Sequence, residues 1–192
     1  MNGVIWPEGP HLYKKEGYYY LMIAEGGTGP DHSVTVARSR QIGGPYEGNP
    51  DNPILTHRHL GKNYPVVYVG HGDLVEAADG SWYMVMLASR REQGFTLMGR
   101  ETFLAKVVWE NGWPVVNPGI GKLEEHIELP MEEYPFEPKD TVYHFWQDRL
   151  PMDFVMLRNP AKNLYSLTER QGWLRLRLRT ETLRDEASPA YL

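Results

Sequence analysis

Two stretches of this chain resemble each other, "HLYKKEGYYYLMIA" at residues 11–24 and "DLVEAADGSWYMVMLA" at residues 73–88. In each, a polar turn ending in glycine precedes a run of aromatic and aliphatic residues, the composition that favours strands. When the stretches are aligned, Leu12 falls on Leu74 and the two turn glycines coincide, at an offset of 62 to 63 residues. The alignment predicts two similar antiparallel hairpins.

Each hairpin continues into a third segment that alternates polar and apolar residues, "SVTVARS" (33–39) after the first and "FLAKVVW" (103–109) after the second. Such alternation is typical of a strand. The "ENGW" segment (110–113) has the Asn-Gly pair of a tight hairpin turn. "WLRLRLR" (173–179) also alternates. A repeated unit of antiparallel strands is the sequence pattern of β-propeller blades, and two copies cannot close a ring of blades.

Composition limits the classes of function. The 192 residues are 41% hydrophobic and 23% charged, which predicts a packed core. The net charge of −5 argues against a nucleic-acid or anionic-membrane partner. The chain has no cysteine, which excludes disulfides and thiolate metal sites. Because "MNGVIWPEGP" at the start is unlike a signal peptide, we expect a cytoplasmic protein, although a signal encoded upstream would be missing from this sequence.

An acidic, proline-bearing stretch, "LEEHIELPMEEYPFEPKD", divides the chain. It has little strand pattern, so we expect a linker at residues 123–140. The prediction is therefore a propeller-like domain at residues 1–122 and the opening strands of a second β domain at residues 141–192. The second part is too short to bury a good core alone.

Glu8 is the first candidate for chemistry. It lies in "WPEGP", where prolines fix φ on both sides and Gly9 adopts angles closed to other residues, a setting that aims a side chain. His71 in "GHGDL" also precedes a glycine ahead of its hairpin, and we expect it to correspond to Glu8 in the other repeat. A loop glutamate on the surface and a hydrogen-bonded core histidine are the simpler alternatives.

Arg100, in "MGRETF", opens the third strand of the second repeat, where a surface ion pair is the plain alternative. His57 and His59, in "THRH", have strand spacing, but a zinc site there lacks a third ligand of recognised spacing. No phosphate-binding glycine loop, nucleophile elbow or dinucleotide fingerprint is present.

Five segments together resemble glycoside hydrolase family 43, in the branch of β-xylosidases and α-L-arabinofuranosidases. They follow the family order over nearly the whole chain: "EGPHLYKKEGYYYLMIAEGGTGPDHSVTVARS", "GPYEGNPDNPILTHR", "GHGDLVEAADGSWYMVML", "GRETFLAKVVWENGWPVVNPG" and "RNPAKNLYSLTERQGWLRL". The resemblance implies an all-β fold, a five-bladed β-propeller followed by a β-sandwich. This chain would supply about two and a half blades and the first sandwich strands.

The resemblance also implies roles for single residues. Glu8 falls on the glutamate of the "EGPH" motif, the general acid that protonates the leaving oxygen. His71 and Arg100 fall on sugar-contacting positions of the "GH-x-DLVE" and "GRET" segments, and Thr28 in "EGGT" resembles a subsite residue. No cofactor is required, and a structural calcium ion at His71 is the one metal that the resemblance suggests.

The family hydrolyses glycosidic bonds with inversion, and its catalytic base lies upstream of the "EGPH" segment. We therefore expect a glycosidase polypeptide that is inactive or weakly active alone. Its partners would be an oligosaccharide substrate and either further copies of itself or the N-terminal half of the same enzyme. The alternative is a non-catalytic carbohydrate-binding protein or a structural remnant that oligomerises through open sheet edges.

Overall fold

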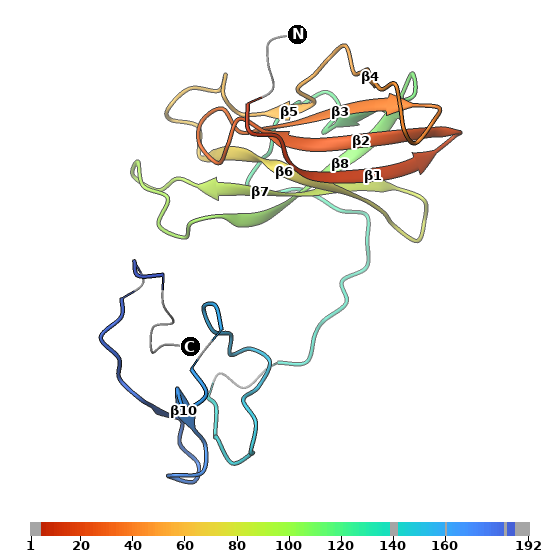
Figure 1. Cartoon of the computed structure of the whole chain (residues 1–192). Coiled ribbons are helices and arrows are strands. Elements are labelled where there is room, and N and C mark those ends of the chain that lie inside the picture. Colours follow the sequence, from red (N-terminus) through yellow and green to blue (C-terminus); the bar gives the residue numbers. More distant parts are fainter. Residues whose placement is uncertain (1–4, 139–141, 160, 183, 187–192) are drawn as a thin grey trace. The chain divides into compact units, whose positions relative to one another are not determined.

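The computed structural model describes residues 5–138, 142–159, 161–182 and 184–186, and every regular element in them is a strand (Figure 1). The all-β prediction is confirmed. The described residues hold no helix that is long and apolar enough to cross a bilayer. The chain divides into two compact units, Met1–Pro130 and Met131–Leu192. The expected domain limits and linker stay predictions.

The first sheet comes from the first repeat. Its strands are β1 (Glu8–Lys15), β2 (Tyr18–Glu25), β3 (Ser33–Ser39), β4 (Glu47–Gly48) and β5 (Leu55–Thr56). They pair antiparallel in the order β1-β2-β3-β4, and β5 also pairs with β3. Glu16 and Gly17 both have positive φ, the conformation of a two-residue hairpin turn that matches strand twist. The predicted hairpin at residues 11–24 is therefore confirmed.

The second sheet comes from the second repeat. Its strands are β6 (Val66–Glu76), β7 (Trp82–Arg90), β8 (Glu101–Glu110) and β9 (Trp113–Val116). They pair antiparallel in the order β6-β7-β8-β9, the same order as in the first sheet. Asn111 and Gly112 both have positive φ in the β8–β9 turn, as the Asn-Gly pair predicts.

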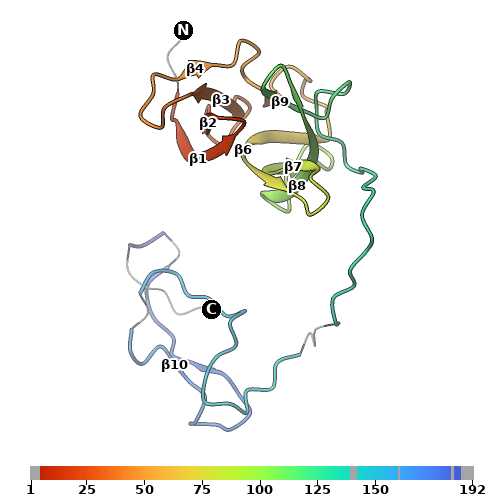
Figure 2. The ribbon, with the colours of Figure 1, turned by 90° about the vertical axis from the view of Figure 1, so that its right-hand side faces the viewer.

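The two sheets pack face to face, with β2 and β3 against β6 (Figure 2). Burial along β2 alternates, so Tyr20, Met22 and Ala24 point into the core while their neighbours are half-buried. The Tyr20 hydroxyl donates to the Gly112 carbonyl oxygen at 2.8 Å, which fastens the first sheet to the β8–β9 turn. The core between the sheets includes Tyr20, Met22, Val34, Val36, Leu55, Val66, Val69, Leu74, Met84, Met86, Ala105 and Val107.

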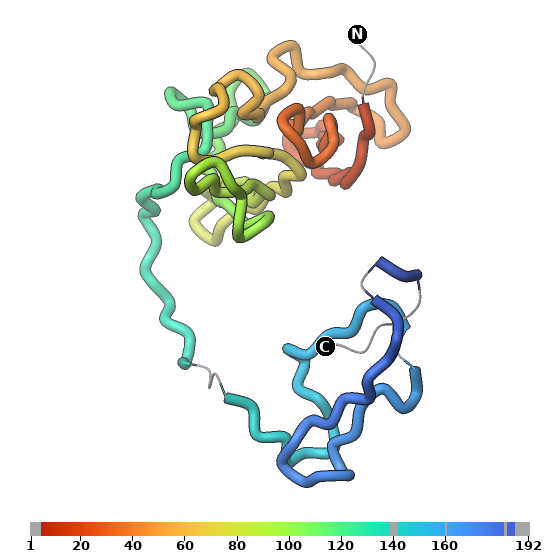
Figure 3. The backbone as a smooth tube through the Cα atoms, turned by 90° about the vertical axis from the view of Figure 1, so that its left-hand side faces the viewer, coloured from red at the N-terminus to blue at the C-terminus, as the bar shows by residue number. Residues whose placement is uncertain are grey.

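The second unit is mostly irregular chain (Figure 3). Its strands, β10 (Tyr165–Ser166) and β11 (Arg175–Leu176), are two residues each. The strand predicted at residues 173–179 is therefore confirmed only at Arg175–Leu176. The reason is the lack of a cover for its apolar side chains, since Leu178 is 93% exposed.

Candidate functional site

Three side chains meet where β1 lies beside β6. Glu8 is the first residue of β1, His71 lies within β6, and His32 directly precedes β3. One ligand atom from each lies within 4.8 Å of the other two. Glu8 is exposed, His71 is half-buried and His32 is buried. The structure thus brings together two residues that the sequence singled out and one that it missed.

The predicted equivalence of Glu8 and His71 is off by one residue. Glu8 pairs with Ala24 and Gly70 pairs with Leu87, so the register makes Gly70 the equivalent of Glu8. The cause is irregular pairing in β6, whose register shifts on both sides of Gly70. His71 also lies inside its strand rather than ahead of it, with a φ of 53° that non-glycine residues rarely adopt. Bulges of this kind re-aim side chains and are common beside active sites.

Two glycines let the histidine rings approach the backbone of the facing segments. A Cβ at Gly9 would lie 2.3 Å from His71 Nε2, and a Cβ at Gly70 would lie 2.3 Å from His32 Cδ2. Neither position has room for a side chain. The glycine in "WPEGP" therefore serves the close contact with His71 as well as its own positive φ.

His32 has a fixed tautomer. Its Nδ1 lies 2.9 Å from the Tyr68 carbonyl oxygen, which only accepts, so Nδ1 carries the proton. Burial is the main reason that the pKa of His32 lies below its ordinary value, and it keeps the ring neutral. Its Nε2 is then an acceptor, and this buried atom has no hydrogen-bond partner among the described residues. Because Nε2 faces Glu8 and His71, it can orient whichever of them carries a proton.

Arg100 lies near this cluster and Thr28 is not part of it. Arg100 is exposed just before β8, and its positive charge makes a small contribution to the lowered pKa of His32. Thr28 is exposed in the turn between β2 and β3. The repeat contains the signal that reveals His32. Ala37 and Ala105 pair with equivalent residues of their sheets, and the same 68-residue offset places His32 on Arg100.

His57 has a structural role. It is 7% exposed, its Nδ1 lies 2.7 Å from the Val66 carbonyl oxygen, and its Nε2 accepts from the Leu123 N–H at 2.8 Å. Both ring nitrogens are thus used inside the first unit. His59, its neighbour in the sequence pattern, is exposed.

The cluster of Glu8, His32 and His71 offers one carboxylate and two imidazole nitrogens. Calcium takes six to eight oxygen ligands, so this donor set does not fit it. The calcium ion at His71 stays a prediction, and no catalytic step is derived through it.

Comparison with known proteins places both units. The model of glycosyl hydrolases family 43 matches residues 1–114, and the model of the beta xylosidase C-terminal concanavalin A-like domain matches residues 142–192. A xylosidase/arabinosidase of Butyrivibrio fibrisolvens is 52% identical over 100% of this chain and 38% of its own length. A non-reducing end alpha-L-arabinofuranosidase of Bacteroides ovatus is 40% identical over 97% of this chain and 35% of its own length.

Solved structures agree. The Bacteroides ovatus xyloglucan-locus GH43B protein superposes with a TM-score of 0.84 at 40% identity, over 98% of this chain and 38% of that one. A xylan beta-1,4-xylosidase from Bacillus halodurans gives a TM-score of 0.81 at 40% identity, over 92% and 34%. The likeness confirms the propeller and sandwich fold class, while the number of blades stays a prediction. The chain spans little more than a third of the length of these relatives.

Proposed function

Because the chain belongs to glycosyl hydrolases family 43, we propose that it carries the general-acid side of a glycosidase active site. The substrate class is saccharides bearing xylose or arabinose, since matched relatives are named xylosidase/arabinosidase and alpha-L-arabinofuranosidase. The reaction is hydrolysis of the terminal glycosidic bond with inversion.

The observation that carries the proposal is the setting of Glu8. Its carboxyl group is exposed, so it can reach a bound sugar, and it lies within 4.8 Å of imidazole nitrogens of His32 and His71. The buried His32 ring and the tight contact at Gly9 limit how far the neighbouring groups can move. A proton donor held in one orientation is what general acid catalysis requires.

In the proposed reaction, Glu8 gives its proton to the glycosidic oxygen as the bond to the anomeric carbon breaks. A second carboxylate takes a proton from the water that attacks the opposite face of the sugar. Inverting enzymes place these carboxyl groups about 6.5–9.5 Å apart to admit that water. The cluster contains Glu8 as its one carboxylate, so the base comes from another part of a family 43 catalytic domain.

The other residues would bind the sugar. Arg100 is exposed and close enough for its charge to act on His32, so its guanidinium can donate to sugar hydroxyls at this site. His71 lies between Glu8 and the second sheet and would contact the sugar beside the acid. We assign Thr28 to a more distant subsite, because it lies in the β2–β3 turn outside the cluster.

A chimera tests the proposal. In the Butyrivibrio fibrisolvens relative, the segment that matches this chain is replaced by the whole chain. The chimera should hydrolyse nitrophenyl β-D-xyloside or α-L-arabinofuranoside, and the isolated chain should show little or no turnover. Glu8→Gln should abolish most turnover of substrates with poor leaving groups. Glu76→Gln is the matched control, because Glu76 is an exposed glutamate at the end of β6. An active chimera that tolerates Glu8→Gln on every substrate would remove Glu8 from the mechanism.

A further inference from the structure

One face of the first sheet has no partner in the first unit. We call it the leading face and define it by the half-buried or exposed residues Leu12, Leu21, Ile23, Thr35 and Ala37. They alternate with the core residues of β1, β2 and β3. The strand register places Leu12 beside Leu21 and Leu21 beside Ala37, which makes one apolar row across three strands.

The second sheet has an equivalent row, and there it is buried. Leu74 pairs with Met84 and Met84 pairs with Ala105, with exposed fractions of 6%, 0% and 0%. The equivalent Leu12 of the first sheet is 48% exposed. The repeat therefore presents the same face twice, once covered and once open.

The cover of the buried row is the opposite face of the first sheet. A Cβ at Gly72 would lie 2.7 Å from Met84 Sδ and 3.4 Å from Val34 Cγ2, so this face of β6 and β7 points at β3. The sheets thus stack head to tail, since two different faces meet. Such a contact leaves one unused face at each end of the stack.

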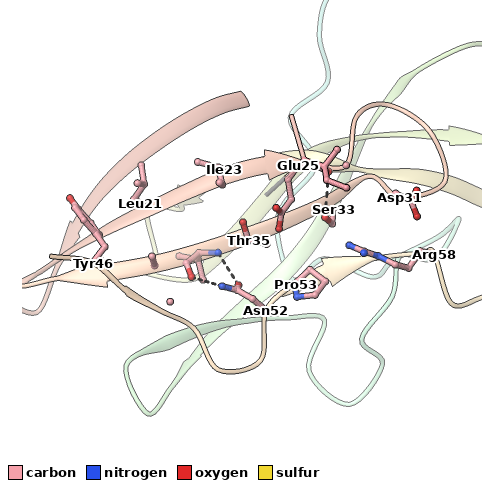
Figure 4. Close-up of a pocket in the computed structure, with 15 residues that line it drawn as sticks. Leu21, Ile23, Glu25, Asp31, Ser33, Thr35, Tyr46, Asn52, Pro53 and Arg58 are labelled. Carbon is pink, nitrogen blue, oxygen red and sulfur yellow. Dashed lines mark hydrogen bonds between the residues drawn. The ribbon is translucent and has the colours of Figure 1, made fainter. Parts of the chain in front are cut away.

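The open face also has the shape of a seat. A groove of about 700 Å³ runs over β2 and β3, lined by Leu21, Ile23 and Thr35 and by the loop residues Tyr46 and Pro53 (Figure 4). Beside it, the Asn52 side chain makes two hydrogen bonds with the Val36 backbone, N–H to Oδ1 at 2.9 Å and Nδ2 to O at 2.8 Å. These bonds fix the loop that forms the groove wall.

Polar groups lie at one end of the groove, Glu25 and Asp31 beside Arg58, while its middle is apolar. An apolar centre with charged groups at the rim is the composition of a protein interface.

From the repeated face we infer that the leading face is the seat of a further antiparallel sheet, supplied by the part of a family 43 catalytic domain that this chain does not contain. The inference rests on the proposed function for the identity of the partner. Residues 142–192 match a C-terminal domain, and the chain spans 38% of the Butyrivibrio fibrisolvens relative, so most of that relative's remaining length lies ahead of the match. The occupant would present a face like that of Tyr20, Met22 and Val36.

Thiol alkylation tests the seat without any measurement of turnover. The chain has no cysteine, so Thr35→Cys places a single reactive group on the leading face. Ile120→Cys is the control, because Ile120 is 50% exposed and follows β9 in the second sheet. The rate of maleimide labelling, followed on the peptide by mass spectrometry, is compared between the isolated chain and the chimera described above.

We expect labelling of Thr35→Cys to be at least tenfold slower in the chimera than in the isolated chain, and labelling of Ile120→Cys to change less than twofold. Equal rates at position 35 would overturn the inference, as would a chimera recovered only as aggregate. Protection in the isolated chain that grows with its concentration would assign the seat to a second copy and would also overturn it. A protected but inactive chimera would leave the seat standing while the proposed function fails.

Discussion

Gly70→Ala should destabilise the first unit by driving a methyl group into His32. The added Cβ would lie 2.3 Å from His32 Cδ2, 2.4 Å from Nε2 and 2.5 Å from Cγ. The ring has no easy escape, because it is 1% exposed and its Nδ1 is bonded to the Tyr68 carbonyl oxygen. Overpacking of this kind costs about 1–3 kcal/mol. Gly70 does not have positive φ, so backbone strain adds nothing to the steric cost.

Urea unfolding measures the change in the free energy of unfolding. Gly43→Ala is the matched control, since it also lacks positive φ and its Cβ would meet no atom within 4 Å. Such a change stabilises by about 0.4–1 kcal/mol through the unfolded chain. In a His32→Ser background, the cost of Gly70→Ala should fall towards that of the control. An unchanged cost in that background would refute the steric role assigned to His32.

Three further outcomes follow from the same contacts. Burial lowers the pKa of His32 and His57 below the ordinary 6.5, so the unfolded chain binds protons there first. The free energy of unfolding should be level above about pH 7 and fall below about pH 6.5, by up to about 1.4 kcal/mol per pH unit for each ring. His57→Gln should flatten this slope in urea titrations between pH 5 and 8, and an identical slope would argue against the assignment. Tyr13→Phe should cost about 1–3 kcal/mol, because the Tyr13 hydroxyl donates to Asp73 and accepts from the Leu74 N–H at 2.9 Å. Tyr19→Phe, in the same sheet, should cost less than about 0.5 kcal/mol, and equal costs would contradict the role of Tyr13.

The strands of the first unit could be predicted because each carries two agreeing signals. In β2 the aromatic and aliphatic residues follow a turn whose Glu16 and Gly17 adopt positive φ, and in β3 the alternation of "SVTVARS" matches the alternation of burial. The segment "WLRLRLR" carries alternation alone. Its described partner, Tyr165–Ser166, is only two residues long, so little of the pattern becomes strand.

The site was harder to predict than the fold. Glu8 could be found from its prolines and glycine, but alternation could not place His71, since β6 is irregular on both sides of Gly70. His32 was missed because the hairpins align at 62 to 63 residues while the third strands align at 68. The connection that precedes β8 is longer than the one that precedes β3, and a single offset cannot reveal both equivalences.

The dependence of rate on leaving group tests the central claim, that Glu8 is the general acid, most directly. In the chimera, kcat/KM for Glu8 and for Glu8→Gln is compared across aryl xylosides or arabinofuranosides of increasing leaving-group pKa. General acid catalysis contributes about 10²–10⁴ in rate. The account predicts a loss of that size for poor leaving groups and a loss below about tenfold for dinitrophenyl, which scarcely needs a proton. Equal losses along the whole series would contradict it.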